Sequence, residues 1–345
     1  MTAGPSDGQP PQDWPTASVV MTVVNEERHL RHAIDRLLAQ DYPGVLDIVI
    51  AVGPSRDRTR EVADAIAARH DHVTVVDNPT GKTPSGLNAA IGATDSTVVV
   101  RIDGHAMVPP DYVTTGVRTL LTTGADNVGG VMAAEGTTGF ERAVARAMTS
   151  RFGVGGAAFH VGGDPGPALT VYLGCFRRSA LERVGGYDES MVRAQDWEMN
   201  LRIRQSGGAV WFTPDMRVTY RPRHDTKSLA RQYHDYGRWR REVARRHPDT
   251  VSLRYLAAPV AVVGAGAGVA LAVAGAVARQ PWLVGLGLAA PVGYALLDLA
   301  ASAQSAMTAP RLAWREAARL PAVYATMHGA WGAGFLRGVP RKAGG

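Results

Sequence analysis

The polar residues most suited to chemistry lie in Arg101-Ile102-Asp103-Gly104-His105, directly after a run of β-branched residues. Alternate residues of an extended chain face the same side, so Asp103 and His105 can bind one divalent ion between them. A carboxylate oxygen with an imidazole nitrogen suits Mn²⁺ or a similar metal, and Mg²⁺ is a second option. Such an ion would neutralise a diphosphate in the bound state and as a leaving group. The alternative is a strand-end Asp and a loop His that hold no ligand.

The segments that would position this pair alternate between strand-like and helix-like patterns. We expect strands at 18–24, 47–52, 72–76 and 97–102, and helices at 26–40, 60–70 and 87–93. Strands separated by helices form parallel sheets with right-handed crossovers, which indicates an α/β fold. Ligands of such sheets bind beyond the carboxyl ends of the strands. The polar residues just after each strand are therefore the candidates for binding.

Further motifs follow in a fixed order along the chain. They are Val24-Asn25-Glu26-Glu27, Lys82 before Leu87-Asn88-Ala89-Ala90, Tyr172-Leu173-Gly174-Cys175-Phe176-Arg177-Arg178, Val184-Gly185-Gly186-Tyr187-Asp188-Glu189, Gln195-Asp196-Trp197-Glu198-Met199-Asn200-x-Arg202 and Gln232-Tyr233-x-x-Tyr236-Gly237-Arg238-Trp239. Together they resemble the family 2 glycosyltransferases, and among these the succinoglycan-type enzymes that build bacterial surface polysaccharides. The resemblance covers 18–246, and His328-Gly329-Ala330-Trp331-Gly332 looks like that family's membrane tail.

The resemblance implies a GT-A-type, Rossmann-like catalytic domain, a nucleotide-sugar donor and inversion at the anomeric carbon. Asp103 and His105 stand at the metal-binding positions, and Asp196 stands at that of the catalytic base. An inverting transfer needs one carboxylate to take the proton of the attacking hydroxyl. The departing diphosphate needs positive charge. The implied donor-binding residues are Asn25, Glu26, Glu27, Lys82 and Asp103, and the implied acceptor or diphosphate contacts are Gln195, Gln232, Arg238 and Trp239.

Two departures from the family pattern bear on specificity. The loop after the second strand usually begins with an Asp that hydrogen-bonds the nucleotide base, and Val52 holds that position here. The base of the donor therefore stays open, while Asp57 is expected to cap a helix. The second departure is that Gln232, Arg238 and Trp239 are spaced more widely than the Gln-x-x-Arg-Trp motif of processive members. Trp239 is either a stacking platform or a packing residue.

Two apolar stretches near the end of the chain predict a membrane hairpin. Residues 256–278 carry no charge and residues 282–303 carry one, Asp298. About 20 such residues span a bilayer core. The link Arg279-Gln280-Pro281 permits only a tight turn, and Gly264 and Gly268 would let the two helices approach closely. A third stretch, 320–336, would be a third membrane helix, a re-entrant helix or an interfacial one. The alternative is a buried helical hairpin in a soluble domain.

Charge predicts the orientation of the hairpin. The chain has a formal net charge of +6. The segment 221–254 before the hairpin is densely basic, Arg311, Arg315 and Arg319 follow it, and its turn holds only Arg279. Both basic flanks are expected on the cytoplasmic face of the inner or plasma membrane, together with the catalytic domain. The basic run would attract anionic membrane lipids rather than nucleic acid.

Composition agrees with a cytoplasmic head and suggests how the chain divides. The single cysteine, Cys175, allows no intrachain disulfide and fits a reducing compartment. The N-terminal residues lack the apolar core of a secretion signal. We expect a disordered tail at 1–17, the catalytic domain at 18–223, a basic interfacial segment at 224–255, two transmembrane helices at 256–303 and a basic tail at 304–345.

The predicted activity is therefore an inverting transfer to a lipid-linked or glycan acceptor, in cell-surface polysaccharide or glycolipid biosynthesis. Other polysaccharide-assembly proteins are further candidate partners. A nucleotidyltransferase would carry a Gly-rich basic loop where Asn25-Glu26-Glu27 stands. A decayed sugar-nucleotide-binding protein would explain Val52 but not the retained Asp103, His105 and Asp196. The segment Thr80-Gly81-Lys82-Thr83 is not a P-loop, because Val76 stands where a glycine is required.

Overall fold

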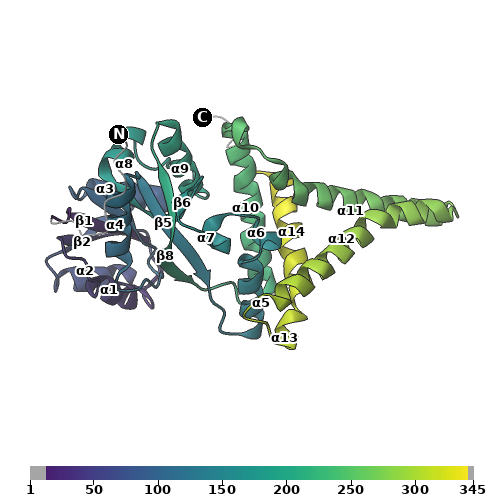
Figure 1. Ribbon diagram of the computed structural model, residues 1–345, viewed down its shortest axis with the longest axis horizontal. Coiled ribbons are helices and arrows are strands. Elements are labelled where there is room, and N and C mark those ends of the chain that lie inside the picture. The colour runs from purple at the N-terminus through teal and green to yellow at the C-terminus, as the bar shows by residue number, and fades with distance from the viewer. Residues whose placement is uncertain (1–12, 341–345) are drawn as a thin grey trace, which may run out of the picture. The chain divides into compact units, whose positions relative to one another are not determined.

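The structure is a computed structural model that describes residues 13–340 of the chain. Most of the tail expected at 1–17 lies outside the described residues. The chain divides into two compact units, one formed by residues 1–133 and 162–220 and the other by residues 134–161 and 221–345. The segment 134–161 therefore belongs with the C-terminal helices, although it lies within the range 18–223 of the expected catalytic domain. Figure 1 labels many of the elements of both units.

The first unit is built on one eight-stranded mixed sheet. Its strand order is β3-β2-β1-β4-β7-β5-β8-β6. The strands are β1 (Ala17–Val23), β2 (Leu46–Val52), β3 (Val73–Asp77), β4 (Val98–Arg101), β5 (Asn127–Ala134), β6 (Gly166–Pro167), β7 (Tyr172–Arg177) and β8 (Val210–Tyr220). Strands β1 to β4 are parallel, as the sequence predicts, whereas β7 pairs antiparallel with both β4 and β5.

The helices of the first unit connect these strands. They are α1 (Leu30–Leu38), α2 (Thr59–Ala67), α3 (Thr83–Gly92), α4 (Tyr112–Thr123), α8 (Arg178–Val184) and α9 (Gln195–Gln205). Helix α1 begins four residues later than the predicted start at Glu26. The reason lies in contacts made across the fold: Asn25 adopts φ 57°, and the backbone N–H groups of Glu26 and Glu27 donate to the side chains of Thr59, the first residue of α2, and of Asp57 in the loop before it. These groups are therefore held outside the helix.

The core of the first unit explains why the early strands can be read from the sequence. Met21, Ile50 and Val100 are fully buried on neighbouring strands, and Leu30 and Ile34 are fully buried on α1. Strands buried in this way appear as continuous β-branched runs. Both ends of each of the four predicted strands lie within one residue of the observed ends.

The second unit is helical. Its elements are α5 (Gly139–Met148), α6 (Arg151–Val154), α7 (Ala158–Val161), α10 (Thr226–Arg246), η1 (Pro248–Thr250), α11 (Leu253–Val277), α12 (Pro281–Met307), α13 (Trp314–Ala317) and α14 (Leu320–Arg337). Glycines set the spacing of α10 and α14, because a Cβ added at Gly237 would lie 2.0 Å from the Trp331 carbonyl oxygen, and one at Gly334 2.0 Å from that of His234. The stretch 320–336 is thus one continuous helix packed on α10.

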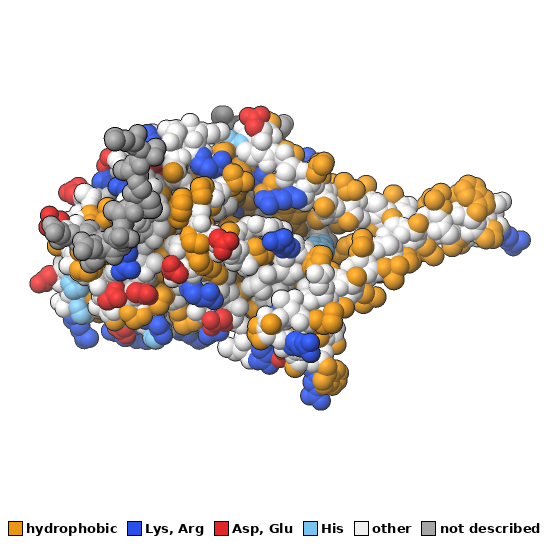
Figure 2. All heavy atoms as spheres, in the orientation of Figure 1, with side chains coloured by type: hydrophobic (Ala, Val, Ile, Leu, Met, Phe, Trp, Pro, Cys, Tyr) orange, Lys and Arg blue, Asp and Glu red, His pale blue; other side chains and the backbone are white. Residues whose placement is uncertain are grey.

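Helices α11 and α12 form the predicted hairpin, and among the described residues they are the two helices long and apolar enough to cross a membrane. Only 11% and 6% of their most apolar windows are buried, whereas the core helix of a soluble protein would be mostly buried. Their outer surface is predominantly apolar in Figure 2, and Val260 and Leu297 are 65% and 73% exposed. These features favour a lipid-facing hairpin.

Small residues let the two helices of the hairpin approach closely, but the predicted glycine pair is only half right. A Cβ at Gly268 would lie 2.4 Å from the Gly287 carbonyl oxygen, whereas a Cβ at Gly264 would meet nothing within 4 Å. Gly264 therefore lies outside the helix contact. The close contact on α12 is made by Gly287, which the sequence pattern did not single out.

Gly130 on β5 provides a test of the sheet. A Cβ at this position would lie 1.8 Å from the Met216 carbonyl oxygen on β8, so Gly130→Ala requires the backbone to shift. We expect a cost of about 1–3 kcal/mol and a Tm lower by several degrees, measured by tryptophan fluorescence in detergent. The control is Gly92→Ala in α3, where a Cβ meets nothing within 4 Å. Equal Tm values for the two variants would contradict the close approach of β5 and β8.

Candidate active site

The turn after β1 is tied to the loop after β2. The backbone N–H of Asn25 donates to Ser55 Oγ at 3.1 Å, and Asn25 Oδ1 accepts from the Arg56 N–H at 2.8 Å. The N–H of Glu26 donates to Thr59 Oγ1 at 2.7 Å. The side chain of Asn25, a predicted donor-binding residue, thus holds the two loops together at the carboxyl ends of their strands.

The two glutamates of this turn have different surroundings. The Glu27 carboxylate accepts from the backbone N–H and from Nε of Arg58, and the first of these contacts is the main cause that lowers the pKa of Glu27. Asp57 accepts from the Glu27 N–H and from the N–H of Thr59 at the start of α2. Glu26, in contrast, points to His105, with 3.1 Å between Oε1 and Nδ1. Of the two, Glu26 is the one that meets a residue of the predicted metal pair.

Arg101 joins the two acidic residues on which the predicted chemistry depends. It is 3% exposed at the end of β4, and it donates from Nη2 to Asp103 Oδ1 at 3.1 Å and from Nη1 to Asp196 Oδ1. The side chains of Asp103 and Asp196 are 25% and 22% exposed, so both remain accessible from solvent. One buried guanidinium therefore holds together the predicted metal ligand and the predicted base.

Burial sets the basicity of Asp196. Desolvation raises the pKa of Asp196 to about 6, Arg101 acts in the opposite direction, and the negative charge of Asp103 adds to the rise. The ring of Tyr187 lies 6.0 Å from the Arg101 guanidinium carbon. The carboxylate is thus ionised at neutral pH yet more basic than an ordinary aspartate, which suits a group that accepts a proton.

No role for Arg101 was predicted, although the sequence holds a signal for it. Strand β4 reads Val98-Val99-Val100-Arg101, so its only charged residue follows three buried valines. A buried arginine requires an acidic partner. Asp103 lies only two residues from Arg101, so the sequence offers it as a partner. Asp196 is 95 residues from Arg101, and only the folded chain brings the two close together.

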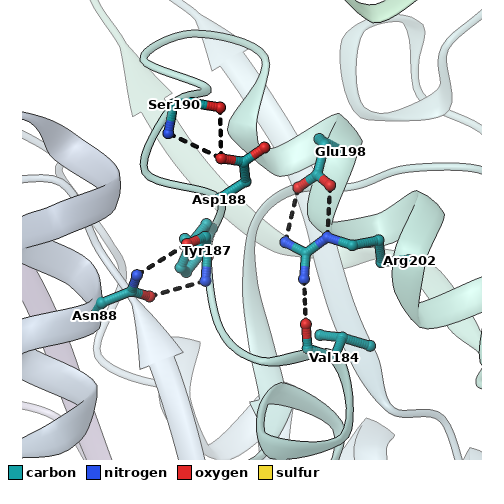
Figure 3. A network of polar contacts seen from close by, with 7 residues as sticks. All are labelled: Asn88, Val184, Tyr187, Asp188, Ser190, Glu198 and Arg202. Atoms are coloured by element: carbon teal, nitrogen blue, oxygen red, sulfur yellow. Dashed lines mark hydrogen bonds and ion pairs between the residues drawn. The ribbon is translucent and has the colours of Figure 1, made fainter. Parts of the chain in front are cut away.

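Most of the other motif residues hold the segment that carries Asp196. Figure 3 shows the Asn88 amide exchanging two hydrogen bonds of 2.8 Å with the backbone of Tyr187. It also shows Arg202 bound to the Glu198 carboxylate of its own helix and to the Val184 carbonyl oxygen. Gly186 has φ +73°, and a Cβ there would lie 2.8 Å from Asn88 Oδ1. These contacts fix the loop before α9, and Asp196 is the second residue of that helix.

The described residues contain no group of three His, Cys, Asp or Glu side chains that could hold a metal ion. Asp103 and His105 supply one oxygen and one nitrogen, and Asp103 already faces Arg101 while His105 faces Glu26. Magnesium, by comparison, is often bound through one or two carboxylates together with substrate phosphates. The donor set thus fits a cation that arrives with a diphosphate better than a fully protein-bound cation.

The remaining candidates of the first unit occupy separate places in it. Lys82 is exposed at the N-cap of α3, and Gln195 is the first residue of α9. Val52 is 5% exposed at the end of β2, so the position expected to read a base presents a buried aliphatic side chain.

The three candidates of the second unit all lie on α10. Gln232 Nε2 donates to the Tyr236 hydroxyl at 3.0 Å. Arg238 Nε donates to the Gly338 carbonyl oxygen at 2.9 Å, so Arg238 ties α10 to the end of α14. Trp239 is half-buried on the same helix. The contacts of Arg238 are those of a structural residue of this unit.

Sequence comparisons find related proteins. Residues 18–185 match the family described as glycosyl transferase family 2. The chain is 34% identical over 322 residues to the succinoglycan biosynthesis protein ExoA of Rhizobium meliloti (strain 1021), across 92% of this chain and 93% of that protein. It is 22% identical over 229 residues, 64% of this chain and 71% of the relative, to the dolichyl N-acetyl-alpha-D-glucosaminyl phosphate 3-beta-D-2,3-diacetamido-2,3-dideoxy-beta-D-glucuronosyltransferase of Methanococcus voltae.

A solved structure supports the fold over nearly the whole chain. It is the mannosyltransferase PcManGT from Pyrobaculum calidifontis in complex with GDP-Man and Mn²⁺, with a TM-score of 0.61 and 20% identity. The likeness covers 97% of this chain and 90% of that chain. The expected GT-A-type α/β fold is thereby confirmed, and in this chain the two apolar helices α11 and α12 follow it.

The bridge made by Arg101 can be tested without an assay of activity. Arg101→Met leaves two partly buried carboxylates unpaired, and removing one partner of a buried pair costs about 3–5 kcal/mol. We expect a Tm lower by several degrees. The double variant Arg101→Met/Asp196→Asn should recover part of that loss, because it removes one uncompensated charge.

The control for this test is Arg60→Met, which breaks exposed ion pairs with Asp64 and Asp77. Exposed pairs contribute about 0–1 kcal/mol, so Tm should change little. A double variant no more stable than Arg101→Met would show that Arg101 does not act through Asp196.

Proposed function

Because this chain belongs to glycosyl transferase family 2 and is therefore a glycosyltransferase, we propose that it moves a sugar from a nucleotide-sugar donor to a lipid-linked or glycan acceptor, with inversion at the anomeric carbon. The observation that carries the proposal is the Arg101 guanidinium between Asp103 and Asp196. The Arg101 guanidinium contacts both carboxylates. Asp103 is suited to a diphosphate-bound metal ion, and Asp196 is suited to the role of base.

In this proposal Asp196 takes the proton of the acceptor hydroxyl as that oxygen attacks the anomeric carbon. Its raised pKa of about 6 makes it a better proton acceptor than an ordinary aspartate while it stays ionised at neutral pH. Arg101 orients the carboxylate and lowers the cost of keeping it ionised. The partly buried contacts of Asn88 and Arg202 with the loop before α9 then support the helix that carries the base.

The donor would lie along the carboxyl ends of β1, β2 and β4. Asn25, Glu26 and Glu27 form the turn beneath the donor, and this turn is hydrogen-bonded to the loop after β2. Lys82 at the start of α3 adds positive charge for the diphosphate. Asp103 and His105 would hold Mn²⁺ or Mg²⁺, which supplies charge neutralisation for the departing diphosphate. Gln195 beside the base is a candidate acceptor contact, and Gln232, Arg238 and Trp239 remain candidates on α10.

The membrane helices suggest the setting of the reaction. By the positive-inside rule, the basic flanks of the hairpin favour a catalytic unit on the cytoplasmic face of the inner or plasma membrane. A relative is named for succinoglycan biosynthesis and another for transfer to a dolichyl-linked sugar phosphate. These names favour a lipid-linked acceptor in polysaccharide or glycolipid assembly. The donor base is left open by Val52.

The decisive assay is donor turnover by the full chain in detergent, with Mn²⁺ and a panel of UDP-, GDP- and dTDP-sugars. One donor should be turned over in a metal-dependent way, and Asp196→Asn should lower kcat at least about 100-fold, because base catalysis is lost. Asp215→Asn serves as control, since Asp215 is exposed on β8 and, among residues 13–340, its side chain hydrogen-bonds only with Thr213. Release of pyrophosphate from a nucleoside triphosphate and a sugar phosphate would instead identify a nucleotidyltransferase. Donor binding without turnover would identify a decayed binding protein.

The pH dependence tests the environment of the base. Burial raises the pKa of Asp196 above its ordinary value, so the ionised form is lost as the pH falls through about 6 rather than through about 4. At fixed saturating metal, kcat/KM should fall about tenfold per pH unit below that point, since the free enzyme must hold an ionised base. A profile that stays flat down to about pH 4 would contradict this role for Asp196.

A further inference from the structure

His105 lies in a turn just after β4 rather than in the extended segment expected from the sequence. The N–H of Ala106 donates to the Asp103 carbonyl oxygen at 2.9 Å, which closes this turn. Residues two apart share a face only where the chain is extended, so the backbone alone does not align the two predicted metal ligands. Each side chain therefore depends on a contact of its own. The Asp103 carboxylate is held by Arg101. The contact of His105 is with Glu26.

The turn packs directly on the end of β1, and this packing brings His105 to Glu26. A Cβ added at Gly104 would lie 2.5 Å from Val23 Cγ1 and 3.7 Å from Glu26 Cγ. Val23 is the last residue of β1, so any larger residue at position 104 would push the turn away from that strand. With glycine there, His105 Nδ1 and Glu26 Oε1 are 3.1 Å apart, which is a normal hydrogen-bond distance.

Glu26 is the more restrained member of this pair. Its N–H donates to Thr59 Oγ1 at 2.7 Å. Its carbonyl oxygen accepts from the N–H groups of His29 and Leu30, at 3.0 and 2.9 Å. The Glu26 side chain is 20% exposed, whereas that of His105 is 56% exposed. The imidazole is therefore the group that would rotate if the carboxylate were removed.

The same contact decides which ring nitrogen of His105 carries the proton. In a neutral imidazole one nitrogen donates a hydrogen bond and the other accepts one, whereas an ionised carboxylate only accepts. The contact with Glu26 therefore requires the proton on Nδ1, and the lone pair of the ring is then on Nε2. A metal ion binds the nitrogen that carries the lone pair, so this tautomer is the one that binds a cation through Nε2.

We propose that Glu26 is a positioning residue that fixes the orientation and the tautomer of His105, so that Nε2 of this histidine binds the divalent cation together with Asp103. The inference rests on the proposed function, because that function supplies the diphosphate with which the cation arrives. Histidines that bind metals usually donate their other N–H to a carboxylate, a carbonyl group or water. Loss of such a partner lowers metal affinity about 10–100-fold.

The first measurement needs neither metal nor donor. The full chain with ¹⁵N-labelled histidine is studied by solid-state NMR in phosphatidylcholine bilayers, and the signals of His105 are those that His105→Gln removes. The unchanged protein should carry the His105 proton on Nδ1. Glu26→Leu should lose this preference. Glu26→Gln should keep it, because the amide oxygen can accept from the same N–H.

The second measurement is Mn²⁺ binding, followed by electron paramagnetic resonance in detergent with UDP and with GDP. Glu26→Leu should lower Mn²⁺ affinity about 10–100-fold and abolish the coupling between Mn²⁺ and an imidazole nitrogen. Glu26→Gln should lose less affinity and keep the coupling. The control is Glu61→Leu, which removes the same charge from an exposed position on α2. Its affinity should match that of the unchanged protein.

Three outcomes would overturn the proposal. The first is equal Mn²⁺ affinity of Glu26→Leu and Glu61→Leu. The second is weak binding by Glu26→Leu with the imidazole coupling intact, since Glu26 would then be a metal ligand itself. The third is no imidazole coupling in the unchanged protein.

Donor turnover is measured in parallel, which separates this proposal from the proposed function. If no donor is turned over while the tautomer of His105 and the Mn²⁺ affinity both depend on Glu26, the transferase proposal fails and the positioning role stands. If a donor is turned over in a metal-dependent way while neither property depends on Glu26, the positioning role fails and the transferase proposal stands.

Discussion

The ion pairs of Arg101 are the constraint on which the active site depends. A guanidinium that is 3% exposed must have acidic partners, and it has two, from segments of the chain that are far apart in sequence. If either carboxylate were absent, the positive charge of the buried arginine would be only partly neutralised. If the arginine were absent, two partly buried carboxylates would repel each other. The three groups therefore specify one another, and the sheet end and the start of α9 are held together by that requirement.

Much of the surrounding sequence serves this arrangement without taking part in the proposed chemistry. Asn88 and Arg202 bind backbone groups of the loop before α9, and Asn200 is fully buried against Asn127. Polar groups buried in this way have to be satisfied, so each fixes the geometry of a backbone segment. This explains why the motifs that carry the family resemblance include many amides and arginines that do not face the proposed donor site.

The sequence was sufficient for the parallel half of the sheet and for the apolar hairpin, because both leave long uninterrupted patterns. It was insufficient where contacts distant in sequence decide the structure. Helix α1 starts late because the side chains of Thr59 and Asp57, at the start of α2 and just before it, accept from the N–H groups of Glu26 and Glu27. The antiparallel strand β7 between β4 and β5 could not be inferred from Tyr172-Leu173-Gly174, since pairing direction leaves no local signature. Asp103 and Asp196 were singled out separately by type and resemblance, whereas their shared partner Arg101 required the fold.

The division of the chain also limits how it can be shortened. Residues 134–161 belong to the helical unit, yet they are encoded between strands of the sheet unit. A protein truncated just before the hairpin would keep α5 while losing α12, α13 and α14, which pack against it. The side chains of Val144, Ala147 and Met148, which are buried on α5, would then meet water. A soluble fragment of this enzyme would thus need either a redesigned α5 surface or a short loop in place of 134–161. Truncation before the hairpin would not by itself produce a soluble fragment.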